Sequence, residues 1–167
     1  MRKLVVSLTL AVLFSLPVLA QDKAEVFGGY QYSRLSSTNF NGWNGAFTGN
    51  LNNWLGVTAD LSGAYKSQAG TSFQQHNFLF GPTVSYRKLE SVKPFAHALF
   101  GVAHANAAFS GLGASDNSFA MALGGGVDAS ITHRFSLRLV QADWMRTSFG
   151  SVGQNNARIS TGIVFKF

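Results

Sequence analysis

The stretch Asn156-Ala157-Arg158-Ile159-Ser160-Thr161-Gly162-Ile163-Val164-Phe165-Lys166-Phe167 alternates polar and apolar residues and decides the fold. As a β-strand it places Ala157, Ile159, Thr161, Ile163, Phe165 and Phe167 on one face and Asn156, Arg158, Ser160, Gly162, Val164 and Lys166 on the other. Chain ends usually fray in water, so a strand this regular at the end of a chain is unusual for a soluble domain. A membrane barrel requires one, because its last strand pairs with its first and its lipid-facing positions are apolar.

The beginning of the chain has the order of a secretory signal peptide. Met1-Arg2-Lys3 is basic, residues 4–16 are nearly all apolar, and Pro17-Val18-Leu19-Ala20 ends on a small residue before a polar segment. The apolar run is shorter than the roughly 20 residues that a membrane-spanning helix needs. We therefore expect a signal helix over 1–20, cleaved after Ala20, and a single barrel domain over 21–167.

The composition excludes several classes of protein. The net charge is +6, but Lys and Arg do not cluster, so nucleic acid is not an expected partner. The chain has no cysteine, which excludes disulfides and thiolate metal sites. Charged residues make up only 12% of the chain against 13% aromatic residues, an unusual balance for a soluble basic protein. Beyond the signal segment no run is long and apolar enough for a membrane helix, so a membrane crossing must use strands.

Alternation with a period of two continues along the chain and predicts eight strands. The expected segments are 24–34, 42–51, 54–66, 73–88, 94–105, 117–132, 135–147 and 156–167. Both faces of 94–105 are apolar, so the phase of this strand stays open. In 135–147, Arg138 has the opposite parity to Gln141 and Asp143, and a bulge near Val140 would turn all three side chains inward.

The connections between these segments differ in length and composition. Three are short, at 52–53, 89–93 and 132–134, and four are longer and rich in Gly, Ser and Asn, at 35–41, 67–72, 106–116 and 149–155. This arrangement predicts an up-and-down barrel with both termini on the periplasmic side of an outer membrane. Aromatic girdles are expected at the two interfaces, with Tyr86 and Phe135 at the periplasmic end and Tyr30, Tyr32, Trp43, Tyr65 and Trp144 at the outer end.

With its signal segment, its strand count, its 138–144 strand and its terminal Ile163-Val164-Phe165-Lys166-Phe167, the chain resembles the eight-stranded outer-membrane barrels, a group that includes the OmpA transmembrane domain, OmpX and the opacity-protein-like family. The resemblance implies an all-β, transmembrane, antiparallel up-and-down barrel in the outer membrane. It also implies that Ile163, Phe165 and Phe167 form the signal that the barrel-assembly machinery reads during insertion.

The charged residues predict what fills the barrel. Four acids and four bases share the inward parity, namely Glu25, Asp60, Arg87, Asp128, Arg138, Asp143, Arg158 and Lys166. Asp128 and Arg138 flank one turn at equal distance, Asp143 and Arg158 flank the last long connection, and Glu25 meets Lys166 if the first and last strands pair. An eight-stranded barrel is only wide enough for its own side chains. We therefore expect a lumen closed by paired charges, and no open pore.

Other functions have weaker support in the sequence. The four histidines are scattered, with no nucleophile–base or metal-ligand spacing, so we expect no enzyme, metal or cofactor. An outer-membrane lipid-modifying enzyme remains an alternative, through His76 and through His104 with Asn106 and Ser110. A secreted or periplasmic lipocalin-like barrel that binds a small molecule is a second alternative. The expected partners are membrane lipid and lipopolysaccharide, whose phosphates Arg34, Lys66 and Arg146 could contact from the outer rim of a monomer.

Overall fold

The computed structural model describes residues 23–35, 38–68, 71–89, 91–109, 112–149 and 152–167. These residues form eight strands, β1 (Ala24–Leu35), β2 (Thr38–Asn50), β3 (Leu55–Gln68), β4 (Thr71–Ser85), β5 (Val92–Phe109), β6 (Leu112–Ser130), β7 (Phe135–Phe149) and β8 (Val152–Lys166). Among the described residues there is no helix of membrane-spanning length and hydropathy. The expected signal segment 1–20 and its cleavage point lie outside the described residues, so they stay a prediction.

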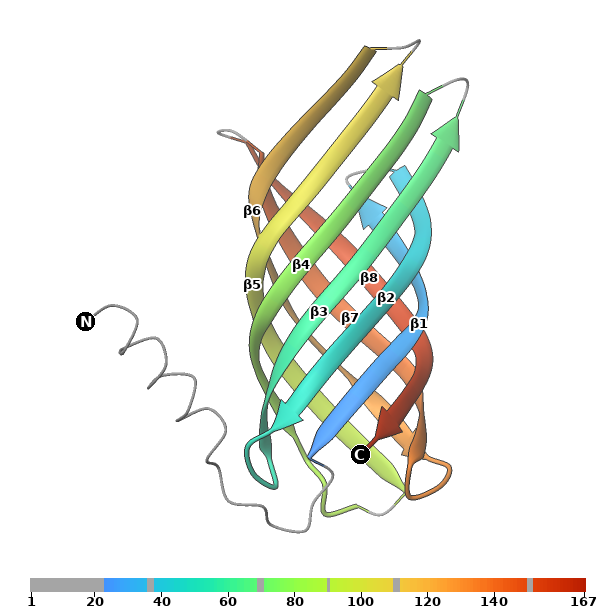
Figure 1. Cartoon of the computed structure of the whole chain (residues 1–167), viewed down its shortest axis with the longest axis vertical. Helices are drawn as coiled ribbons and strands as arrows, with labels where there is room; N and C mark the ends of the chain where they lie inside the picture. The colour runs from blue at the N-terminus through green and yellow to red at the C-terminus, as the bar shows by residue number, and fades with distance from the viewer. Residues whose placement is uncertain (1–22, 36–37, 69–70, 90, 110–111, 150–151) are drawn as a thin grey trace, which may run out of the picture.

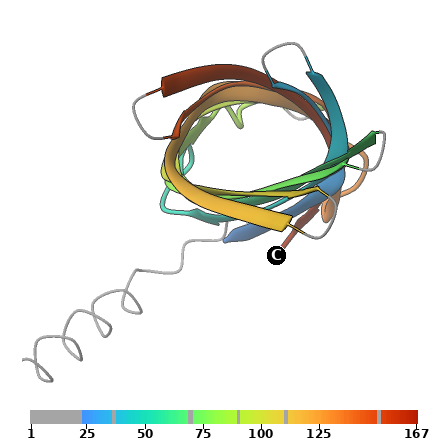
Figure 2. The same ribbon diagram turned by 90° about the horizontal axis from the view of Figure 1, so that it is seen from above.

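The strands close into one antiparallel barrel in which each strand pairs with its neighbour in the chain and β1 pairs with β8. Figure 1 shows the strands strongly tilted, with β1 beginning and β8 ending at the same end of the barrel. We call this the terminal end and the opposite one the distal end. Seen along its axis, the barrel is a complete ring (Figure 2). The predicted fold class and strand count are therefore confirmed.

The seam between β1 and β8 is made by the stretch that indicated the fold. It runs in register from Glu25↔Lys166 to Leu35↔Asn156. The backbone also closes the terminal end, because Lys23 N–H donates to the Phe167 carbonyl and Phe167 N–H donates to the Ala24 carbonyl. Every strand thus has two neighbours, which satisfies the backbone groups that a hydrocarbon environment would leave unpaired.

The predicted length of the four longer connections is wrong. β1 ends at Leu35 and β2 begins at Thr38, and the other three distal connections also leave only two residues between strands. The expected loop at 106–116 is mostly strand, with β5 and β6 paired as far as Phe109↔Leu112. Polar residues continue the ladder here because a strand outside the membrane needs no apolar face, so the loss of alternation did not mark the end of pairing.

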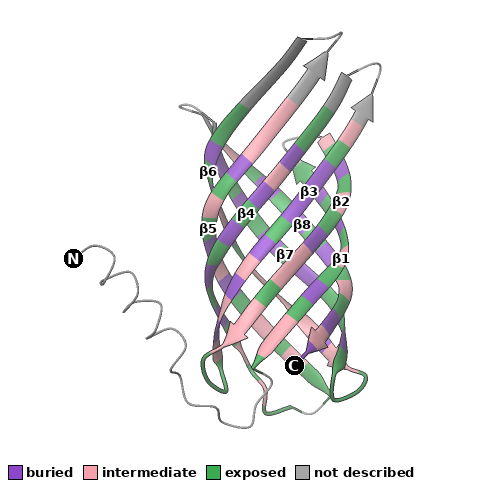
Figure 3. Ribbon diagram, viewed as in Figure 1, coloured by how far each residue is buried: buried purple, intermediate pink, exposed green. Residues whose placement is uncertain are grey.

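The two faces of the sheet alternate between lumen and exterior along every strand, as the purple and green bands of Figure 3 show. The structure also fixes the phase of β5, which the sequence left open. His97, Leu99 and Ala103 are buried in the lumen, and Phe100 and Val102 are exposed on the outer face. Lys93 shares the inward parity, because its register partner on β6 is the buried Asp128.

The expected bulge near Val140 is present in β7. Val127 of β6 pairs with Val140, and the next residue, Asp128, pairs with Arg138, so β7 has one extra residue at this point. Both Leu139 and Val140 are exposed on the outer face. The phase of β7 changes between them, which brings Arg138 and Gln141 to the same side of the sheet.

Candidate functional site

The centre of the lumen is an ion cluster around Arg158 of β8. This side chain is fully buried and bridges two acids: Nη1 lies 2.7 Å from Asp60 Oδ1, and Nη2 lies 2.7 Å from Asp143 Oδ2. Asp60 comes from β3 on the other side of β1 and β2, so the bridge crosses the lumen. Asn44 donates to the second Asp60 oxygen, and His97 Nε2 lies 2.8 Å from Asp143 Oδ1. The cluster therefore ties five strands together inside the barrel.

A second ion pair joins β6 to β7 nearer the terminal end. Arg138 donates from Nε to Asp128 Oδ1 at 2.8 Å and from Nη2 to Asp128 Oδ2 at 3.0 Å, a bidentate geometry. The guanidinium also lies against two rings, 4.3 Å from the centroid of Phe27 and 4.2 Å from that of Phe95. Gln141 accepts from Arg138 and donates to Asp143, so it links this pair to the central cluster.

The third group lies at the mouth of the terminal end. Glu25 and Lys166 are register partners across the seam, but the ion pair described for Glu25 is with Arg87, at 3.1 Å. Arg87 also donates to Asn50, and Lys166 donates from Nζ to Ser136 Oγ at 2.6 Å. Parity alone assigned partners by strand adjacency, whereas the long Arg87 side chain reaches across the lumen to β1 and β2.

Two inward residues were missing from the sequence-based set because the phase of β5 was open. Lys93 adds a fifth basic side chain to the four acids of the lumen, so the expected equal number of inward acids and bases is wrong. His97 joins the central cluster through Asp143. One signal could have found both: Lys93 on the outer face would meet lipid or its interface, so parity with the charge inward was the better assignment. Phe27 of β1 is likewise buried on the inward side.

Little space remains between these groups. The cavity around the ion pairs has a volume of about 20 Å³, roughly enough for a single water molecule. Towards the distal end the β4–β7 side of the lumen is filled by apolar side chains, Leu79, Leu99, Ala103, Ala120, Ala122 and Met145. Side chains thus obstruct the lumen of the barrel at two levels.

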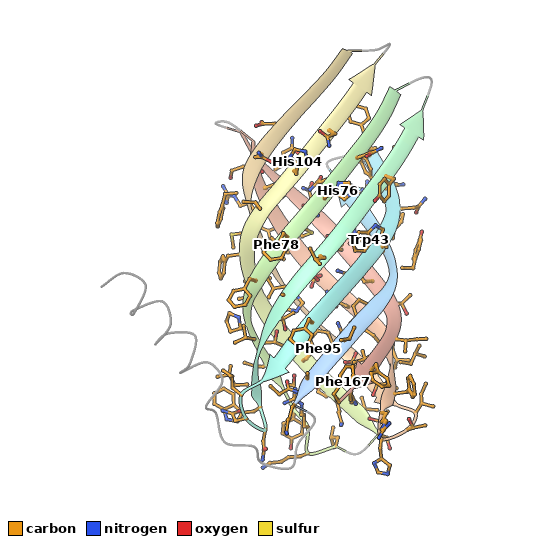
Figure 4. All side chains as sticks on the ribbon, in the orientation of Figure 1. Trp43, His76, Phe78, Phe95, His104 and Phe167 are labelled. Carbon is orange, nitrogen blue, oxygen red and sulfur yellow. The ribbon has the colours of Figure 1, made fainter. Side chains whose placement is uncertain are left out.

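The outer face carries the aromatic residues expected in the girdles. All seven are exposed, namely Tyr30, Tyr32, Trp43, Tyr65, Tyr86, Phe135 and Trp144. Hydrogen bonds link some of them sideways, since Trp43 donates to the Tyr65 hydroxyl at 3.2 Å and this hydroxyl lies 3.0 Å from His76 Nε2. Figure 4 shows Trp43, His76 and His104 towards the distal end and Phe95 and Phe167 towards the terminal end. At the seam, Phe165 packs edge-on against Phe135 and Phe167, while Ile163 is exposed.

The histidines considered for catalysis do not assemble a site with a nucleophile in the described part of the chain. His76 and His104 are register partners on β4 and β5. His104 Nδ1 lies 2.6 Å from Asn117 Oδ1, so each imidazole is bonded to a different neighbouring strand. Ser110 lies outside the described residues. Within the described ranges no three His, Asp or Glu side chains are grouped to hold a metal ion.

Comparison with known proteins identifies the family. The family model described as outer membrane protein beta-barrel domain matches residues 6–167. The chain belongs to this family. The protein is therefore an outer-membrane β-barrel, and its buried ion pairs lie inside a wall that faces lipid.

Solved outer-membrane barrels share its architecture. Neisserial surface protein A (NspA) is 16% identical, with a TM-score of 0.65 over 86% of this chain and 96% of that chain. Ail, the attachment invasion locus protein of Yersinia pestis, is 19% identical, with a TM-score of 0.59 over 85% of this chain and 97% of that chain. The N-terminal barrel of Pseudomonas aeruginosa OprF is 13% identical, with a TM-score of 0.56 over 87% and 98%. There is no match among curated protein sequences. Identities this low establish the shared fold alone.

Proposed function

We propose that this outer-membrane barrel is closed to solutes, has no catalytic activity and acts as a structural and surface-interaction protein. The observation that carries the closed lumen is the buried bridge from Asp60 through Arg158 to Asp143, which spans the barrel interior. A charge so placed is held by partners on both sides, and moving it aside would leave two carboxylates unpaired. A lipocalin-like ligand inside the barrel has no support, since the cavity measures about 20 Å³.

Single-channel recording in a planar lipid bilayer tests the closed lumen. The folded protein is expected to give no steady conductance steps, while a trimeric porin added in parallel gives large ones. Regular steps from the wild-type barrel would show an open pore and refute this part of the proposal. Analysis of bilayer lipids after incubation with the barrel tests the absence of catalysis, because acyl chains cleaved or transferred would refute it.

The surface for interaction is the distal extension of β3 to β6. Figure 1 draws these strands rising above the rest of the rim. Among the described residues, β6 pairs with β7 only from Phe119↔Ser148 downward, whereas its pairing with β5 continues to Leu112. Residues 112–118 thus form a sheet edge that no described residue of β7 pairs with. Such an edge can accept an extended peptide as an added strand.

We also propose lipopolysaccharide as a partner of the outer face. Arg34 of β1 and Arg146 of β7 are exposed on the two strands that flank β8, at the levels of Ala157 and Asn155. Guanidinium groups recognise phosphate oxygens by paired hydrogen bonds. Lys66, expected in this set, instead lies 6.0 Å from the ring of the buried Phe40. The R34A/R146A variant should therefore lose lipopolysaccharide association, with K66A as its matched control. Unchanged association in R34A/R146A would exclude this surface.

The terminal residues of β8 are our proposed assembly signal. Phe167 is 63% exposed and its ring contacts only Phe165 among the aromatic contacts described. Phe167→Ala is expected to reduce the heat-modifiable barrel recovered from cell membranes several-fold. Refolding of the purified F167A variant into detergent should remain efficient, because the machinery is absent there. An equal loss in both experiments would instead mean that Phe167 acts through stability.

A further inference from the structure

The terminal end of the barrel contains an open basin that the closed lumen does not use. It lies between the connection from β4 to β5 and the turn from β6 to β7, and its volume is about 720 Å³. Ligand sites in proteins commonly measure about 300–1,000 Å³. Its walls include Arg87, Lys93, Ser130, His133 and Lys166. Three of these, Arg87, Lys93 and Lys166, also line the small inner cavity, so they form the floor that separates the basin from the ion network.

The two acids nearest this floor, Glu25 and Asp128, already have basic partners. Glu25 pairs with Arg87 beneath the basin. Asp128, the register partner of Lys93, gives both oxygens to Arg138. Lys93 consequently has no ion-pair partner among the described residues, and none of the described residues that line the basin is acidic. A concave surface with charges of one sign concentrates ions of the opposite sign.

A polar donor in the wall points to the same chemistry. Ser130 Oγ is buried from solvent and has no hydrogen-bond partner. Leaving a buried hydroxyl unpaired costs free energy, roughly 1–3 kcal/mol. A hydroxyl, an ammonium and a guanidinium together are donors that suit an oxyanion. Arg87 donates hydrogen bonds to Glu25, Asn50 and the Asn52 carbonyl, and a guanidinium has five N–H groups in all.

We propose that this basin binds a phosphate group, either inorganic phosphate or the head of a small phosphomonoester. Lys93 supplies the uncompensated charge, Ser130 donates from the wall, and Arg87 and Lys166 complete the floor. The site is independent of the proposed lack of conductance, because a bound anion leaves the Arg158 cluster beneath it unchanged.

Phosphate titration of the isotope-labelled barrel in detergent micelles, followed by nuclear magnetic resonance, tests the proposal. Sodium chloride is exchanged for sodium phosphate at constant ionic strength, and the amide signals of Ser130 to His133 are followed. Saturable shifts are expected in these residues. Lys93→Met should weaken binding about tenfold, corresponding to one lost charged contact of about 1.4 kcal/mol. Lys88→Met removes an exposed lysine at the same end that does not line the basin, and should leave binding unchanged.

Two further experiments test which phosphate compound binds and whether the carboxylate of Glu90 competes with it. In the first experiment glycerol 3-phosphate replaces inorganic phosphate. Saturable binding of either compound supports the site, and the compound with the lower dissociation constant identifies the class of ligand. The second uses Glu90→Gln, because Glu90 lies in the β4–β5 connection and outside the described residues. Chemical shifts that grow linearly with phosphate, in both the wild-type and the E90Q protein, would overturn the proposal. It would also be overturned if Lys93→Met left the shifts unchanged in both backgrounds.

Discussion

Arg158 is the largest side chain that the barrel buries completely, and its two carboxylate partners come from β3 and β7. In a soluble protein an apolar core of similar volume is often as stable as a buried ion pair. Here the exterior of the wall is apolar because lipid surrounds it, so the interior is where the sequence can place charge. The cluster favours one register of the strands, because each buried charge is stable only where its partners can reach it.

Replacing Arg158 by methionine should destabilise the barrel strongly. The substitution leaves Asp60 and Asp143 buried with one partner fewer, and breaking a buried pair costs about 3–5 kcal/mol. Urea unfolding in lipid vesicles, followed by tryptophan fluorescence, measures the change. Adding Asp60→Asn and Asp143→Asn to R158M should restore part of the stability. If R158M matches the wild type, the cluster does not stabilise the fold.

The same test applies to the second ion pair, with a different control. Arg138→Ala strands the buried Asp128, and the expected loss is again roughly 3–5 kcal/mol. Arg146→Ala removes an exposed arginine from the same strand and should change the unfolding free energy by less than about 1 kcal/mol. Equal effects of the two substitutions would contradict the pairing as a source of stability.

Gly124 illustrates how closely β6 and β7 approach each other. A Cβ at this position would overlap Asp143 Oδ1 and the carbonyl oxygen of Ala142. Gly124→Ala should therefore cost about 1–3 kcal/mol through overpacking. The matched control is Gly28→Ala, where a Cβ meets no atom within 4 Å, and its effect should stay within about 1 kcal/mol. Equal unfolding midpoints for the two variants would show that the wall can spread at Gly124.

At the scale of the element, the bulge in β7 sets which residues face the lumen. Deleting Val140 would remove the extra residue and turn Arg138 to the lipid face. An arginine on the lipid face costs about 2–4 kcal/mol at the bilayer midplane and less towards the interface, where Arg138 lies, and the Asp128 pair would be lost as well. The deletion is expected to prevent folding into vesicles, measured by the heat-dependent shift in electrophoretic mobility. Val140→Ala keeps the bulge and should fold normally; a folded deletion variant would refute this account.

The distal ends of β5 and β6 should be dispensable for the fold. Above Phe119 the described part of β6 pairs only with β5. Residues 107–109 of β5 also pair with residues 71–73 at the distal end of β4, so replacing 107–114 removes pairing at the distal rim alone. Replacing 107–114 with a two-residue Asn-Gly turn should preserve the mobility shift and the unfolding midpoint. Binding of extended peptides to the outer surface, if it uses this edge, should disappear. Loss of folding would instead make the extension part of the core.

The elements differ in how far the sequence could predict them. Alternation in β3 and β8 was decisive because most inward residues are polar and most outward ones apolar, with the buried Ala64 and Val164 as exceptions. In β5 alternation could not separate the two faces, because the inward Leu99 and Ala103 are as apolar as the outward residues. Lys93 and His97 were therefore not assigned to the lumen. The pairing of Asp128 with Arg138 follows from local symmetry about one turn. The bond from Arg158 to Asp60 does not, because it depends on how a tilted ring brings distant strands face to face.

For the molecule as a whole, the arrangement of polarity predicts how it behaves in a membrane. Large apolar and aromatic side chains are exposed on all eight strands of the ring, and every strand has both neighbours, so the wall needs no second copy to satisfy its backbone. The purified barrel is therefore expected to be a monomer. Sedimentation in density-matched detergent measures the protein mass per micelle, and a mass of two or more mature chains would contradict this expectation.

The wall of the barrel is taller on one side than on the other, so its outer surface is not equivalent in all directions within the plane of the membrane. The taller side, from β3 to β6, shields anything that approaches over it, while the edge of β6 is open only towards the lower side of β7. A peptide that approaches along the cell surface can therefore reach that edge only from the β7 side of the barrel. How often such encounters succeed depends on how fast the barrel spins about the membrane normal, and a neighbour fixed beside β7 would close the approach without touching the edge itself.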